Sequence, residues 1–169
     1  GRREDLLASM KRAGVDYSLN LPIASRPKQV ESINSFAISV NGRDGLFSLG
    51  GIHPLYENYR EELKRIRAAG LIGVKLHPDF QEFHIDDEKA FPIYEAIEGR
   101  MPLLVHTGDS RTEYSKPWRL AKILDRFPKL NVIAAHFGGY SEWENGALSL
   151  ALKNVYVDRS EERRVGKEC

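Results

Sequence analysis

Residues 102–109 read PLLVHTGD, a short apolar run that ends on a histidine, a threonine, a glycine and an aspartate. The apolar part does not alternate with polar residues, which is typical of a parallel strand covered by helices on both faces. The stretch NVIAAHFGG at 131–139 repeats this arrangement. Because the carboxyl ends of parallel strands meet on one side of a sheet, where ligands bind, we expect His106 and His136 to converge there.

Strand-like runs of this kind alternate with amphipathic helical patterns along the whole chain, and no hairpin signals lie between them. The predicted strands are residues 15–23, 46–54, 71–78, 102–109, 131–139 and 154–158. A typical helical pattern is the stripe of Val30, Ile33, Ala37 and Val40. The landmarks that end successive strands are 24, 29, 30 and 22 residues apart, which are the lengths of βα units; they are His53, His77, His106, His136 and Asp158.

Two parallel α/β architectures fit this pattern, a doubly wound open sheet and a (β/α)8 TIM barrel. A barrel needs eight strands and about 250 residues, whereas this chain offers six strands in 169 residues. The barrel interpretation therefore requires that the chain be a fragment. The absence of a methionine before Gly1 favours the same interpretation.

The composition, with 41% hydrophobic and 29% charged residues, is that of a soluble globular protein. No window approaches the roughly 18 apolar residues of a membrane span, and there is no charged and then apolar leader. We therefore expect a cytoplasmic protein without a membrane partner. The net charge of +1 comes entirely from the last eleven residues, so the neutral remainder argues against nucleic acid as a partner.

Residues 159–169, RSEERRVGKEC, match the translation of a widely used sequencing-adapter oligonucleotide. We therefore predict that residues 1–158 form the natural, incomplete domain and that 159–169 are a non-native tail. Cys169 then has no place in the natural segment, which contains no other cysteine. This composition excludes a disulfide framework and a thiolate metal site.

The chemistry of two convergent imidazoles favours a divalent metal, because neutral ring nitrogens bind zinc-like ions near neutral pH. Small residues follow both His106 and His136 and would leave room for a ligand. The alternative is that each histidine only caps its strand by bonding a backbone carbonyl group. The repetition of the arrangement at two strand ends favours the metal.

Several of these motifs, taken in order, resemble the amidohydrolase superfamily, and most of all the amidohydrolase-related branch of metal-dependent TIM-barrel hydrolases and decarboxylases. The similarity is carried by GGIHP at 50–54, the run from 70 to 109, LAKILDRFPKLNVIAAHFGG at 120–139 and NVYVD at 154–158. It covers nearly all of residues 1–158. It implies a partial (β/α)8 TIM barrel that contains strands 2 to 7 and lacks strands 1 and 8.

The same resemblance implies the roles of the two histidines. His106 matches the metal ligand at the end of strand 5. His136 matches the strand 6 histidine, which is catalytic in one-metal members and a metal ligand in two-metal members. The cofactor would be a divalent metal, zinc above all, with one or two ions left open. The H-x-H pair of strand 1 and the aspartate of strand 8 do not occur in this chain.

The resemblance implies a metal-dependent hydrolase that acts on a small organic substrate through a metal-activated water. A metal-dependent nonoxidative decarboxylase is the alternative within the same branch. A third interpretation is that the chain as printed is truncated and catalytically inactive. Open strand edges and an exposed apolar lumen in a six-stranded arc would favour aggregation or domain swapping. A homo-oligomer is a further alternative for the intact protein.

Further candidates have structural alternatives. Lys75 lies in the apolar run GVKLHP and is predicted to be catalytic, by binding a substrate carboxylate or by becoming carboxylated between two metals; otherwise its stem extends to solvent. His77 is predicted to bind substrate, although His77 and His53 both precede proline and would also suit turns. Asp158 could orient another site residue. Trp143 is predicted to be a packing aromatic on a helix.

Overall fold

Every strand pair that the structure describes within either unit is parallel, as the βα pattern predicts. The computed structural model describes residues 3–159, so the predicted tail at 159–169 lies outside it except for Arg159. The chain divides into two compact units, Gly1–Leu76 and His77–Cys169. No helix among the described residues is long and apolar enough to cross a bilayer.

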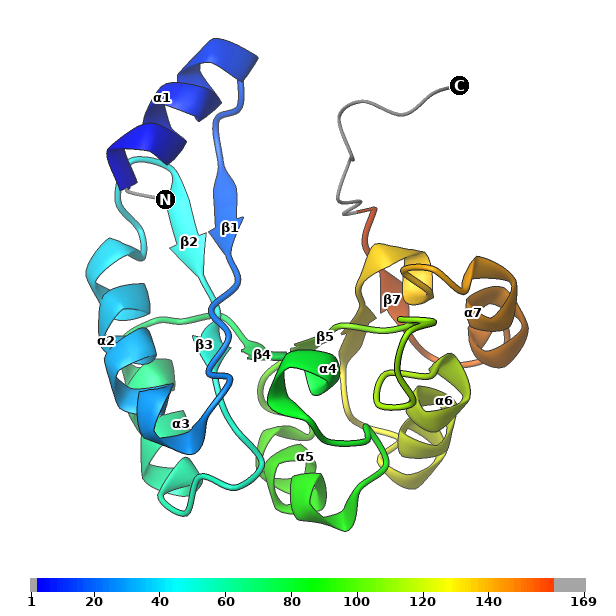
Figure 1. The fold of residues 1–169 in the computed structure, drawn as a ribbon. Coiled ribbons are helices and arrows are strands. Elements are labelled where there is room, and N and C mark those ends of the chain that lie inside the picture. Colours follow the sequence, from blue (N-terminus) through cyan, green and yellow to red (C-terminus); the bar gives the residue numbers. More distant parts are fainter. Residues whose placement is uncertain (1–2, 160–169) are drawn as a thin grey trace. The chain divides into compact units, whose positions relative to one another are not determined.

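The first unit consists of short strands followed by longer helices (Figure 1). Its elements are α1 (Arg3–Ala13), β1 (Ser18–Asn20), η1 (Pro27–Gln29), α2 (Val30–Val40), β2 (Leu46–Ser48), β3 (Gly50–Gly51), α3 (Tyr59–Ala68) and β4 (Val74–Leu76). Strand β1 pairs with β2, and β3 pairs with β4. The single strand predicted at 46–54 is therefore two strands, because its first part bonds to β1 and its second part to β4.

The inner face of α2 differs by one position from the predicted stripe. Val30, Ala37 and Val40 are buried as expected, but Asn34 is fully buried while Ile33 is only half-buried. The Asn34 amide is satisfied there: Nδ2 donates to Gly51 O (2.9 Å) and to Glu62 Oε1 (2.7 Å). The Gly51 N–H donates to Asn34 Oδ1 (2.7 Å). A polar side chain can thus take a core position because it supplies partners to the backbone of β3.

The second unit continues the alternation of strands and helices. Its elements are α4 (Pro78–Gln81), η2 (Glu88–Ala90), α5 (Phe91–Ile97), β5 (Leu103–Val105), α6 (Pro117–Arg126), β6 (Val132–Ala134), η3 (His136–Gly138), α7 (Trp143–Leu150) and β7 (Tyr156–Val157). Strand β6 lies between β5 and β7, and α6 packs beside α7 (Figure 1). All three residues of β5 are buried, as expected for a strand covered on both faces.

Candidate metal centre

The loops that leave β5 and β6 bring His106 and His136 together, as the sequence predicts. His106 Nδ1 lies 3.0 Å from His136 Nε2, and the two rings are inclined at 69° with centroids 4.7 Å apart. The ring of Tyr140 lies against both, with its centroid 5.3 Å from that of His106 and 5.1 Å from that of His136. Convergence is therefore a property of the fold, while the roles of the two histidines remain predictions.

The small residues after each histidine serve close packing of the two loops. Gly108 has a φ of +87°, and a Cβ atom there would lie 2.3 Å from the Cα atom of Gly139. Beside this contact, Tyr140 N donates to Thr107 O (2.8 Å) and Ser141 N donates to Gly108 O (2.8 Å). Only glycine allows this approach, since any side chain would push the loops apart. This packing role is an additional reason for the glycines, and the expectation that these residues leave space for a ligand stays a prediction.

The backbone of His136 is held in an unusual conformation. His136 and Phe137 have φ values of 58° and 60°, a left-handed region that bulky residues rarely enter. Asp158 stabilises it, because its Oδ1 accepts the N–H of His136 (2.8 Å) and its carbonyl oxygen accepts that of Phe137 (2.8 Å). Strained backbone persists where surrounding contacts determine it and is frequent at functional sites. Asp158 thus orients His136 through the main chain.

A buried carboxylate, Asp79, is the site residue that the sequence prediction missed. Its side chain is only 4% exposed. Its Oδ1 accepts hydrogen bonds from the hydroxyl groups of Ser115 (3.0 Å) and Thr112. Its Oδ2 lies 3.6 Å from His106 Nε2 and 3.9 Å from His77 Nδ1. The only sequence signal was its place two residues after His77, at the end of a predicted strand.

His77 lies between two aromatic rings and caps a short helix. Its ring stacks on Phe80 (4.0 Å, 1°) and on His106 (4.0 Å, 9°). Its Nδ1 accepts the Phe80 N–H at 3.4 Å, which caps α4. The turn-forming role considered for His77 is therefore present, and substrate binding by this residue stays a prediction.

Among the described residues of this unit, two sets of donor atoms could hold a metal ion. His77, Asp79 and His106 each offer an atom within 4.8 Å of the others, and His106 and His136 form the second set. An imidazole lone pair lies in the plane of its ring, so two nearly parallel stacked rings cannot both direct lone pairs at one ion. The 9° stack of His77 on His106 therefore disfavours the first set.

The pair His106 and His136 fits a metal better. Their inclined planes can share an ion, and two ligands of tetrahedral zinc, each about 2.0–2.1 Å from the metal, are about 3.3 Å apart. The observed separation of 3.0 Å between His106 Nδ1 and His136 Nε2 is close to this value. These two nitrogens are accordingly a candidate donor pair, and their role as metal ligands stays a prediction.

The candidates in the first unit occupy defined places. Lys75 lies in β4 and is buried. Its predicted catalytic role stays a prediction. His53 accepts the Leu55 N–H at Nδ1 (3.1 Å), and its carbonyl oxygen accepts the Tyr56 N–H (3.0 Å). Burial lowers the pKa of His53. These contacts give His53 the turn-forming role that the proline after it predicts.

An anionic group follows His106 in the same loop. The hydrogen-bonded guanidinium of Arg111 lowers the pKa of the buried Asp109 carboxyl to about 2. Arg111 Nε and Nη2 donate to the two carboxylate oxygens of Asp109 at 2.9 and 2.6 Å. This bidentate pair keeps Asp109 ionised at neutral pH and fixes the loop after β5.

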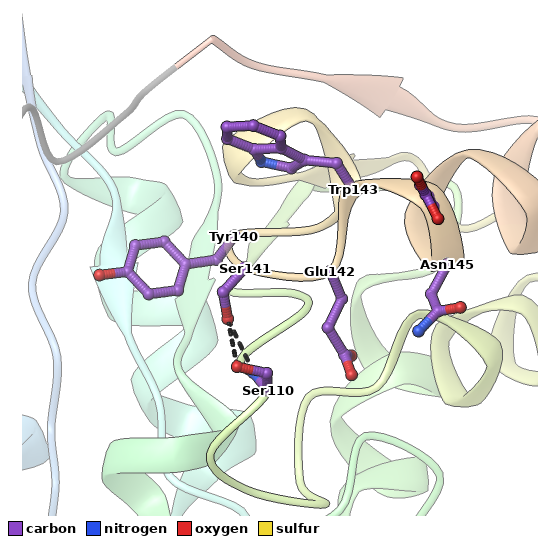
Figure 2. Close-up of a pocket in the computed structure, with 7 residues that line it drawn as sticks. Ser110, Tyr140, Ser141, Glu142, Trp143 and Asn145 are labelled. Atoms are coloured by element: carbon purple, nitrogen blue, oxygen red, sulfur yellow. Dashed lines mark hydrogen bonds between the residues drawn. The ribbon is translucent and has the colours of Figure 1, made fainter. Parts of the chain in front are cut away.

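Tyr140 also lines a pocket of about 620 Å³ in the second unit (Figure 2). In Figure 2, the hydroxyl groups of Ser110 and Ser141 face each other, and Ser141 Oγ donates to Ser110 Oγ at 2.9 Å. Trp143 borders this pocket and is 59% exposed. The prediction that Trp143 is a packing aromatic is wrong, because its position at the start of α7 turns the indole outward. The pocket thus offers aromatic and hydroxyl groups beside the histidine pair.

A family model described as amidohydrolase matches residues 22–165. The chain belongs to the amidohydrolase family. The matched range runs past Asp158, and the origin of residues 159–169 stays a prediction. Membership confirms the resemblance drawn from the ordered motifs, including the segment with His106 and His136.

Solved structures similar to this amidohydrolase chain are TIM barrels. An uncharacterised TIM-barrel protein from Bordetella bronchiseptica has a TM-score of 0.73 at 21% identity, over 94% of this chain and 59% of that one. A 4-oxalomesaconate hydratase from Rhodopseudomonas palustris has a TM-score of 0.62 at 17% identity, over 94% and 59%. A protein from Acinetobacter baumannii described as a 2-pyrone-4,6-dicarboxylic acid hydrolase, with citric acid bound, has a TM-score of 0.58 at 12% identity, over 93% and 59%.

These likenesses decide between the two predicted architectures. The parallel strands and intervening helices form part of a (β/α)8 barrel, and the doubly wound alternative is excluded. The chain spans 59% of the length of each of these three structures. In such barrels the active site lies at the carboxyl ends of the strands, which is where His106 and His136 are found.

Proposed function

We propose that the protein containing this chain is a metal-dependent hydrolase that attacks a small organic substrate with a metal-activated water. The observation that carries the proposal is the 3.0 Å approach of His106 Nδ1 to His136 Nε2 at the ends of two adjacent strands. A bound divalent ion, zinc in this proposal, would lower the pKa of its water to about 7 and so supply hydroxide at neutral pH.

The residues of this chain would hold the ion and orient the reacting groups. His106 would bind through Nδ1 and His136 through Nε2, or His136 would instead hold the reacting oxygen where only one ion binds. Asp158 would keep the His136 main chain in its strained conformation, since it accepts the N–H groups of both His136 and Phe137. Tyr140, which contacts both rings, would close one side of the site and exclude water.

We further propose that the substrate carries carboxylate groups. Two of the similar structures are named for polycarboxylic acids, and one of them holds citric acid. The pocket beside Tyr140 would receive the body of the substrate. The carboxylate-binding role of Lys75, which is buried in the middle of β4 in the first unit, stays a separate prediction. His77 would line the approach to the metal.

Decarboxylation is the second candidate reaction. The names hydrolase and hydratase in the similar structures both denote addition of water, which favours hydrolysis over nonoxidative loss of carbon dioxide. The two reactions differ in their products, so an assay can separate them.

The test uses the intact protein encoded around this chain, purified with its metal. His106→Ala should lose bound zinc and at least 10³-fold of the activity, because it removes a direct ligand; His84→Ala, a histidine of the same unit that is outside the donor set, should keep both. Metal content by mass spectrometry and the release of acid or carbon dioxide from 2-pyrone-4,6-dicarboxylate are the readouts. Stoichiometric zinc in His106→Ala would refute the ligand assignment.

A further inference from the structure

We propose that Asp79 is a positioning residue that selects the tautomer of His106, placing its proton on Nε2 and its lone pair on Nδ1. The proposal rests on the proposed function in one respect: the lone pair on Nδ1 would serve to bind the metal. The tautomer itself is a property of the chain without metal.

The carboxylate of Asp79 is fixed with one oxygen directed at the imidazole. The hydroxyl groups of Thr112 and Ser115 donate to Oδ1, which leaves Oδ2 to face His106 Nε2 at 3.6 Å. Among the described residues Oδ2 is buried and accepts no hydrogen bond. A buried carboxylate oxygen without a hydrogen-bond donor favours a ring nitrogen that carries a proton facing it. A ring nitrogen with a lone pair at that position would be repelled by the negative charge.

His77 does not compete with His106 for this role. The Nδ1 atom of His77 is 3.9 Å from Asp79 Oδ2 but accepts the Phe80 N–H, so it carries a lone pair in the neutral ring. The lone pair of His77 and the carboxylate of Asp79 therefore cannot bond to each other. The N–H that faces the carboxylate must come from His106.

Fixing the proton on Nε2 leaves the lone pair of neutral His106 on Nδ1, the atom that faces His136 Nε2 at 3.0 Å. A histidine binds metal only through an unprotonated nitrogen, and a carboxylate on its other nitrogen orients the ring and raises its basicity. Asp79 would thus direct His106 toward His136 and away from the stacked His77. This assigns a function to a residue outside the His106 and His136 pair.

The Asp79→Asn variant tests the proposal because it should invert the tautomer of His106. The hydroxyl groups of Thr112 and Ser115 require an acceptor, so they would hold the amide oxygen at the Oδ1 position. The amide NH2 group would then occupy the place of Oδ2 and donate toward His106 Nε2. His106 would respond by moving its proton to Nδ1, where it blocks the lone pair that faces His136.

The experiment is nitrogen-15 NMR of the imidazole rings in the metal-free 169-residue chain, which distinguishes protonated from unprotonated ring nitrogens. We expect the Nε2–H tautomer of His106 in the original chain and the Nδ1–H tautomer in Asp79→Asn. Asp125→Asn, which removes a surface carboxylate paired with Lys153, is the matched control and should leave His106 unchanged. An Nδ1–H tautomer in the original chain, or an unaltered tautomer in a folded Asp79→Asn variant, would overturn the proposal.

A second measurement separates this proposal from the proposed function. In the intact protein, Asp79→Asn should weaken zinc binding about 10–100-fold, the usual loss when the partner of a metal-binding histidine is removed. Zinc affinity unchanged in Asp79→Asn would count against the positioning role. Failure of the original intact protein to bind zinc would overturn the proposed function, while the NMR result would still decide the role of Asp79.

Discussion

The two units of the chain each bury a polar side chain, and the hydrogen-bonding atoms of the two side chains are satisfied to different degrees. In the first unit, Asn34 donates to Gly51 and Glu62 and accepts from Gly51, and Arg65 in turn donates to both carboxylate oxygens of Glu62. In the second unit, the Oδ2 atom of Asp79 accepts no hydrogen bond among the described residues and faces histidine rings. A closed network stabilises a fold, whereas an open one retains capacity for chemistry.

The largest expected effect on stability comes from opening the closed network. Asn34→Ala should lower the free energy of unfolding by about 3 kcal/mol, because the buried N–H and C=O of Gly51 both lose their side-chain partner. Urea denaturation measures the loss, and hydrogen exchange of the Gly51 amide reports it locally. Ser39→Ala, an exposed residue of the same helix whose hydroxyl donates to Phe36 O, is the control and should cost less than about 0.5 kcal/mol. Equal losses of unfolding free energy in both variants would show that the hydrogen bonds of Asn34 do not stabilise the fold more than a surface hydrogen bond does.

A smaller effect is expected where a charged acceptor holds strained backbone. Asp158→Ala should cost about 1.5 kcal/mol, the usual contribution of a hydrogen bond to a charged group, because the N–H of His136 loses its acceptor. Asp158→Asn keeps an oxygen at the same position and should retain most of the stability. Thermal unfolding of the two variants makes the comparison. An Ala variant as stable as the Asn variant would show that the Asp158 side chain does not stabilise the His136 backbone.

The smallest effect on stability is expected at the open network. Asp79→Asn should change the free energy of unfolding by less than about 1 kcal/mol, and in the stabilising direction, since it removes a buried charge while Oδ1 still accepts from Thr112 and Ser115. Residues retained for function at a cost to stability behave in this way. A loss as large as that of Asn34→Ala would place Asp79 among the structural residues.

The fold could be predicted from the sequence because local patterns determine it. Apolar runs without alternation identify buried parallel strands, and their spacing identifies βα units. The division of residues 46–54 into β2 and β3 could not be predicted, because it depends on which neighbour each part bonds. The burial of Asn34 in place of Ile33 escaped prediction for the same reason, since only the position of Gly51 makes that polar side chain acceptable in the core.

The candidate site could be predicted in part. His106 and His136 were found because each ends a strand, and strand ends converge in any parallel fold. Asp79 was missed because it follows its strand by three residues, and its direction is set by hydroxyl groups more than 30 residues away in sequence. The role of Asp158 was underestimated because its effect passes through the main chain of His136, which no sequence pattern reveals.

The most direct test of the central claim is NMR of the intact protein, labelled with nitrogen-15 and loaded with cadmium-113 in place of its own metal. The account predicts scalar coupling between cadmium and His106 Nδ1, together with His136 Nε2 if this histidine is a ligand. Coupling to His106 Nε2 or to His77 would contradict it, because the ion would then lie in the Asp79 cluster and the geometry of the stacked rings would have been misinterpreted.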